Sequence, residues 1–105
     1  MKEITSASEL EQLKNGDKPI LIDFYADWCG PCQTMLPIVD ELSDKYDGEV
    51  EIVKVNIDNQ RELAREFGVP SIPSLFFIKK GEIKEHLVGL QPKGVLDSKL
   101  SAYAA

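Results

Sequence analysis

Residues 20–32 of this chain read ILIDFYADWCGPC. The first six have apolar side chains on both alternating faces, which is typical of a strand in the middle of a sheet that is covered on both sides. The helix predicted to follow repeats apolar residues at the spacing of one buried face, at Met35, Val39, Leu42 and Tyr46. The sequence thus predicts a buried strand, a turn that carries two cysteines, and an amphipathic helix.

Patterns typical of helices and strands also occur before and after this segment. A helix is predicted to begin at Ser6 or Ser8, because each serine is followed three residues later by a glutamate, and to end at Gly16. The segments expected further along are a buried strand over 50–56, a short helix over 60–67 that Gly68 ends, an antiparallel hairpin made of 74–78 and 83–88, and a last helix that opens near Pro92.

This order of elements predicts an α/β protein with a central mixed sheet flanked by helices. The chain has 105 residues, of which 43% are hydrophobic and 29% charged, and this balance is that of a folded protein with one packed core. No internal repeat or linker interrupts it. We therefore expect a single domain over residues 1–105.

The charge pattern indicates which classes of partner the chain is expected to bind. The formal net charge is −6, from 18 acidic and 12 basic residues, and the basic residues are scattered, with Lys79-Lys80 as the only adjacent pair. Nucleic acids and anionic membranes attract clustered lysine and arginine, so neither is expected as a partner. No apolar run resembles a secretory signal or a membrane span. The expectation is a cytoplasmic monomer.

The two cysteines are placed for redox chemistry. If Cys29 stands where the turn becomes a helix, free backbone N–H groups and the positive end of the helix dipole favour its thiolate, which is the nucleophile of disulfide exchange. Pro31 fits the first helical turn. Helical geometry puts the Cα atoms of Cys29 and Cys32 about 5 Å apart, inside the roughly 4.4 to 6.8 Å that a disulfide needs. The pair is predicted to open and close with little backbone movement.

A metal site is the main alternative for this cysteine spacing, since zinc and iron–sulfur sites also use two thiols separated by two residues. Such sites need four ligands, and besides the cysteines the chain offers only His86, in a hairpin strand predicted to be exposed. A metal shared between two chains stays open as an alternative. We expect neither a metal nor another bound cofactor.

Asp23 and Lys54 each lie in a predicted buried strand, where an unpaired charge is costly. One interpretation is a structural ion pair, or a lysine that reaches water along its stem. The other is functional, because burial should raise the pKa of Asp23 and make this carboxyl group a proton acceptor and donor for a nearby thiol.

The segments 23–32, 54–58, 71–74 and 88–89 together resemble the thioredoxin family, and the resemblance covers essentially the whole chain. It implies the thioredoxin fold, with helices on both faces of the mixed sheet. It also implies a reductase of protein disulfides that works through a mixed disulfide and is itself reduced by a thioredoxin reductase.

The resemblance also implies roles for individual residues. Cys29 is the nucleophile, Cys32 resolves the mixed disulfide, Asp23 transfers a proton, and Lys54 tunes Asp23. The Ile72-Pro73 bond is cis and faces the cysteines. An apolar rim that docks substrates consists of Trp28, Gly30, Pro31, Ile72, Pro73, Val88 and Gly89.

Three features depart from the commonest pattern of the family. Gln33 stands where a lysine is frequent, Tyr25 where tryptophan is frequent, and residues 69–74 read VPSIPS. These differences bear on the choice of reductase and substrate. Two other functions stay open, namely a docking or chaperone-like module on the same fold, and an oxidant or isomerase, because sequence does not give the direction of electron flow.

Overall fold

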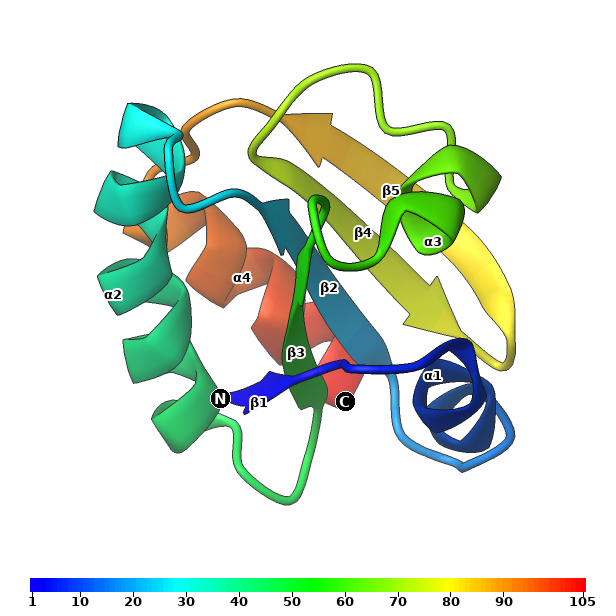
Figure 1. The fold of residues 1–105 in the computed structure, drawn as a ribbon. Helices are drawn as coiled ribbons and strands as arrows, with labels where there is room; N and C mark the ends of the chain where they lie inside the picture. The colour runs from blue at the N-terminus through cyan, green and yellow to red at the C-terminus, as the bar shows by residue number, and fades with distance from the viewer.

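The computed structural model describes residues 1–105 and contains one five-stranded sheet and four helices (Figure 1). The strands are β1 (Lys2–Glu3), β2 (Ile20–Tyr25), β3 (Glu51–Asn56), β4 (Ser74–Lys79) and β5 (Glu82–Val88). The helices are α1 (Ala7–Lys14), α2 (Gly30–Lys45), α3 (Arg61–Glu66) and α4 (Lys93–Ala104). Every predicted element is present, and β1 is the one element that the sequence did not indicate.

The sheet is mixed, as predicted. Its strand order is β1-β3-β2-β4-β5, in which β1, β3 and β2 run parallel to one another, while β4 runs antiparallel to β2 and β5 antiparallel to β4. All six residues of β2 are buried, which confirms the central strand expected over residues 20–25. The carboxyl ends of β2 and β3 therefore meet at one edge of the sheet.

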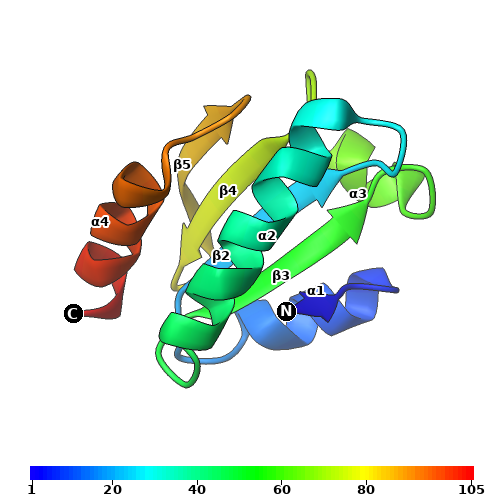
Figure 2. The same cartoon turned by 90° about the vertical axis from the view of Figure 1, so that its left-hand side faces the viewer.

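Helices cover both faces of the sheet, as Figures 1 and 2 show together: α2 and α4 lie on one face, and α1 and α3 on the other. Each face has its own apolar core. Leu21, Met35, Leu42 and Leu96 belong to the core under α2 and α4, whereas Phe24 belongs to the core on the opposite face. None of the four helices combines the length and the apolar character needed to cross a bilayer.

The start of α1 resolves a choice that the sequence left open. The N-cap is Ser6, whose Oγ accepts a hydrogen bond from the backbone N–H of Glu9 (3.3 Å). The glutamate does not return the bond to Ser6. Its Oε1 instead accepts bonds from the backbone N–H (2.7 Å) and the hydroxyl (2.6 Å) of Thr5. The serine half of a reciprocal cap is therefore formed, and the glutamate half is not.

The hairpin of β4 and β5 turns at Lys80-Gly81. Both residues have positive φ, 54° and 78°, as a two-residue turn of type I′ requires. The connection is thus shorter than the four residues between the predicted strands. The pairing of the two strands shifts by a bulge between Phe77 and Ile78.

Candidate active site

The cysteine pair lies at the carboxyl end of β2, where the chain enters α2. Cys29 is the N-cap of α2, with an extended backbone (φ −89°, ψ 110°), and its Sγ accepts a hydrogen bond from the backbone N–H of Cys32 (3.2 Å). Pro31 lies in the first helical turn, as expected. Free N–H groups and the positive end of the dipole of a 16-residue helix therefore point at this sulfur, which favours a thiolate when the pair is reduced.

The two cysteines form a disulfide, and their Cα atoms are 5.2 Å apart. This distance agrees with the helical spacing predicted from the sequence. The two residues differ in access: Cys29 retains 6% of its surface exposed, and Cys32 retains none. Cys29 is therefore the more accessible of the two residues.

A loop before β4 lies against Cys29. Its Ile72-Pro73 peptide bond is cis, which confirms the expectation from the resemblance. The carbonyl oxygen of Ile72 is 3.8 Å from Cys29 Sγ, and the carbonyl oxygen of Pro73 accepts a hydrogen bond from the N–H of Gly89 (2.8 Å). Gly89 has φ of 88°, a conformation that favours glycine. The structure thus brings together four of the predicted site residues from three separate segments.

The predicted apolar rim is unevenly exposed. Trp28 is 70% exposed and Val88 45%. Gly30 and Pro31 are exposed as well, while Ile72 is half-buried and Pro73 lies buried beneath it. None of the five hollows in the surface is lined by a cysteine. The surface around Cys29 therefore offers no pocket for a small molecule.

Asp23 lies in the buried strand β2, where it is the direct register partner of Lys54 in β3. Its side chain is fully buried, and neither carboxylate oxygen has a hydrogen-bond partner in the protein. Loss of hydration raises the pKa of Asp23 to about 7, and the positive charge of Lys54 opposes this rise. The carboxyl group can therefore exchange a proton near neutral pH.

Lys54 is not deeply buried, because 29% of its side chain is exposed. Its Nζ forms an ion pair with Oε1 of Glu3 (3.9 Å), and no ion pair within 4.0 Å joins it to Asp23. The simplest structural interpretation of the two residues, a buried Asp23–Lys54 ion pair, is therefore wrong. Lys54 acts on Asp23 through its charge from a greater distance.

His86 lies away from the cysteines. Its ring stacks on Phe76 with the ring centroids 3.9 Å apart, and Phe76 belongs to the core on the face opposite α2. Its Nε2 is 3.2 Å from the hydroxyl oxygen of Ser74, and that hydroxyl donates to the carbonyl of Ser71 (2.6 Å). The histidine thus supports the loop that carries Pro73. It is exposed, as predicted.

Two residues around the site were not found from the sequence. Oδ2 of Asp58 accepts a hydrogen bond from the indole N–H of Trp28 (2.9 Å), which links the cysteine turn to the end of β3. Glu3, in β1, is the ion-pair partner of Lys54. Asp58 could have been predicted, because the carboxyl ends of neighbouring parallel strands meet at one edge of the sheet. Glu3 could not, because a strand of two residues shows no periodicity in the sequence.

Comparison with known proteins agrees with this geometry. The family model described as "Thioredoxin" matches residues 1–102. The thioredoxin of Porphyra purpurea is 39% identical over 98% of this chain and 96% of its own length, and that of Synechocystis sp. is 41% identical over 96% and 94%. The solved structure of Malassezia sympodialis thioredoxin has a TM-score of 0.92 at 33% identity and covers 100% of this chain and 91% of that one.

These matches run from one end of the chain to the other, and the fold and the cysteine pair at disulfide distance were established independently of them. The arrangement has the components that thiol–disulfide exchange requires, namely an accessible sulfur at a helix start and a second sulfur within bonding reach. The protein is accordingly a thiol–disulfide oxidoreductase, and the chain belongs to the thioredoxin family.

Proposed function

We propose that this protein reduces disulfides in other proteins, with Cys29 as the attacking group and Cys32 as the resolving group. The observation that carries this assignment is the difference in access between the two bonded cysteines: Cys29, at the start of α2, keeps 6% of its surface exposed, and Cys32 keeps none. Only the first can meet a substrate, and only the second is placed to displace that substrate afterwards.

The reaction has two exchange steps. The Cys29 thiolate attacks one sulfur of the substrate disulfide, the S–S bond of the substrate breaks, and a substrate thiolate leaves with the bonding electrons. Cys32 then loses its proton and attacks Cys29 Sγ, which releases the second substrate sulfur and forms the Cys29–Cys32 disulfide. Two electrons have passed to the substrate. A thioredoxin reductase is the proposed partner that returns two electrons to this disulfide.

Asp23 is the proposed proton acceptor for Cys32. A general base works best when its pKa is close to the operating pH, and burial raises the pKa of Asp23 to about 7. Its oxygens have no competing hydrogen bond in the protein. Because Cys32 is buried, bulk water has little access to its thiol, and an internal acceptor is needed.

Substrate docking is proposed at the rim of Trp28, Gly30, Pro31, Ile72, Pro73, Val88 and Gly89. The rim includes a large exposed tryptophan and a valine that is 45% exposed, and no hollow opens at either of them. Exposed apolar side chains of this kind suit segments of other proteins. The Ile72 carbonyl, 3.8 Å from Cys29 Sγ, is placed to accept a hydrogen bond from an extended peptide.

Replacing Asp23 with alanine is expected to slow breakdown of the mixed disulfide, on the order of 10²-fold, and to leave its formation nearly unchanged. The reason is that only the second step needs a proton removed from buried Cys32. Stopped-flow measurements with a substrate that has a chromophoric leaving thiol separate the two rates. Equal slowing of both steps, or of neither, would contradict the proton-transfer role.

The direction of electron flow is proposed to be reduction of the substrate. We expect the Cys29–Cys32 couple to equilibrate with glutathione at a potential below about −200 mV, where reductants of this chemistry operate. A value in the range of secretory oxidants would instead assign the chain as an oxidant or isomerase. Equilibration at defined ratios of reduced to oxidised glutathione, with trapping of free thiols, measures this potential.

We propose a single domain acting as a monomer in the cytoplasm, without nucleic-acid or membrane partners. Both cysteines of the chain are used in the redox pair, so that none is left for a structural disulfide of the kind that small secreted proteins use. Fractionation of the source cells tests the compartment, and sedimentation of the purified chain tests the oligomeric state.

A further inference from the structure

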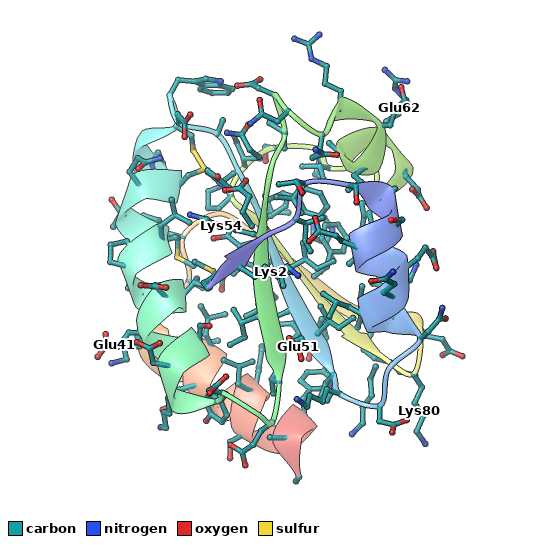
Figure 3. All side chains as sticks on the ribbon, turned by 60° about the horizontal axis from the view of Figure 1, so that its bottom comes forward. Lys2, Glu41, Glu51, Lys54, Glu62 and Lys80 are labelled. Carbon is teal, nitrogen blue, oxygen red and sulfur yellow. A yellow bond between two sulfur atoms is a disulfide. The ribbon has the colours of Figure 1, made fainter.

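Three charged residues lie in one row across the sheet. The register pairs Glu3 of β1 with Lys54 of β3, and pairs Lys54 with Asp23 of β2. Lys54 therefore stands between two carboxyl groups, one on the neighbouring strand at each side. Figure 3 shows Lys54 close to β1, on the side of the sheet that α2 covers. The one positive charge in this row thus has a carboxyl group on each side.

Lys54 forms its ion pair with Glu3, which we call the outer acid because β1 is the edge strand. Its Nζ is 3.9 Å from Oε1 of Glu3 and 5.5 Å from the centre of the Tyr25 ring. Asp23, the inner acid, has no ion pair within 4.0 Å and no hydrogen bond to either oxygen. The arrangement leaves the inner carboxyl group without direct neutralisation.

Tyr25 holds the outer acid in place. Its hydroxyl oxygen is 2.7 and 2.8 Å from the two carboxylate oxygens of Glu3, so that one proton is shared between both. Burial, followed by the bond to Glu3, raises the pKa of Tyr25, and the hydroxyl therefore remains a donor at physiological pH. The Glu3 carboxylate is fixed at the position from which it attracts Lys54.

We infer that Glu3, fixed by Tyr25, is a positioning residue for the redox reaction: it holds the Lys54 ammonium away from Asp23 and so keeps Asp23 able to take up and release a proton at neutral pH. The inference deepens the proposed function and rests on the role assigned there to Asp23. If Lys54 moved onto Asp23, the carboxylate would be stabilised and would become a weaker base.

Other charged groups around Asp23 are few. The neighbour of Asp23 in β4 is Leu75, which does not titrate. On the face of the sheet that α2 covers, the N-cap of this helix is Cys29, and Cys32 lies in its first turn. Asp40 of α2 lines the same hollow as Lys54, and its carboxylate pairs with the amino group of Met1 (3.1 Å). Lys54 is therefore the charged neighbour of Asp23 in the sheet, and Glu3 is the next charged group in the same row.

The first test is a titration of the Asp23 carboxyl carbon by NMR in the oxidised protein, where the cysteines do not titrate. Glu3→Gln is expected to lower the midpoint by roughly one pH unit, because removal of the outer charge releases Lys54 toward Asp23. The matched control is Glu51→Gln, which removes a carboxylate from β3, the strand of Lys54, where Glu51 pairs with Lys18 (3.6 Å). Equal midpoints in the two variants would overturn the inference.

The second test asks whether Glu3 acts through the lysine. In a Lys54→Met background, Glu3→Gln should lower the midpoint by less than half as much as it does in the parent protein, because no ammonium is left to be repositioned. A shift of the same size in both backgrounds would mean that Glu3 acts on Asp23 only by direct repulsion, and the positioning role would be rejected.

The NMR titration of Asp23 does not depend on activity. It therefore tests the positioning role of Glu3 separately from the role of Asp23 as proton acceptor. A lowered Asp23 midpoint together with an equally lowered pH midpoint for mixed-disulfide breakdown supports both. A lowered Asp23 midpoint with an unchanged kinetic profile supports the positioning of Lys54 and rejects Asp23 as the proton acceptor. An unchanged Asp23 midpoint rejects the positioning role, whatever the kinetics show.

Discussion

Replacing Cys29 with serine is expected to abolish reduction of protein disulfides, with a loss of at least about 10³-fold. The hydroxyl group of serine cannot form a disulfide with a substrate or with Cys32. The buried sulfur of Cys32 cannot substitute, because its residue has no exposed surface. Turnover of a disulfide-containing protein with a thioredoxin reductase and NADPH measures the loss.

Cys32→Ser is the matched control for this experiment. It keeps the accessible nucleophile at the start of α2 and removes only the resolving group. We expect turnover to stop while a stable mixed disulfide accumulates on Cys29, visible as an adduct by mass spectrometry. A docking or chaperone-like module would instead keep its binding function in both variants, because binding does not use the sulfur of Cys29. Retention of disulfide reduction by Cys29→Ser would contradict the role of Cys29 as the nucleophile.

Replacing Asp23 with asparagine is expected to stabilise the oxidised protein at alkaline pH, by about 4 kcal/mol in the free energy of unfolding. The folded-state pKa of Asp23 is about 7, compared with an ordinary value of 3.8. Between these values the folded protein binds a proton that the unfolded chain has released, so stability falls as pH rises through this window. Each unit of pKa shift corresponds to about 1.4 kcal/mol.

Asparagine remains neutral at every pH and avoids this cost. The gain over the parent protein should be near zero at pH 3, grow between pH 4 and pH 7, and level off above pH 8. Urea unfolding of the oxidised proteins at a series of pH values measures it. Asp17→Asn, at an exposed position, serves as the control for a lost carboxylate. A gain that is independent of pH would show that burial of the charge is not its cause.

The central part of the fold could be predicted from the sequence because its signals are strong and local. Apolar residues on both faces predicted β2 with the bounds that the structure has, and the cysteine at the helix start was found from the position of Pro31 and the spacing of the buried face. The hairpin was found from its glycine-containing turn, although the turn is shorter than expected.

What the sequence did not show depends on contacts between distant segments. β1 has two residues, too few for any period, and its place at the edge of the sheet follows only from pairing with β3. The partner of Lys54 was missed for the same reason. The side chain of Glu9 bonds Thr5 and not the N–H of Ser6, and the sequence does not determine a choice between such adjacent donors.

The two borders of the sheet discourage growth of the protein into fibrils. An unpaired strand can recruit a strand of another molecule, and long, flat, uncharged borders do so most readily. Here β1 ends the sheet on one side after two residues, and β5 ends it on the other side with Glu82, Lys84 and Glu85 along a strand whose pairing with β4 is interrupted by a bulge. Neither border therefore offers a long, uncharged strand on which a strand of a second molecule could pair.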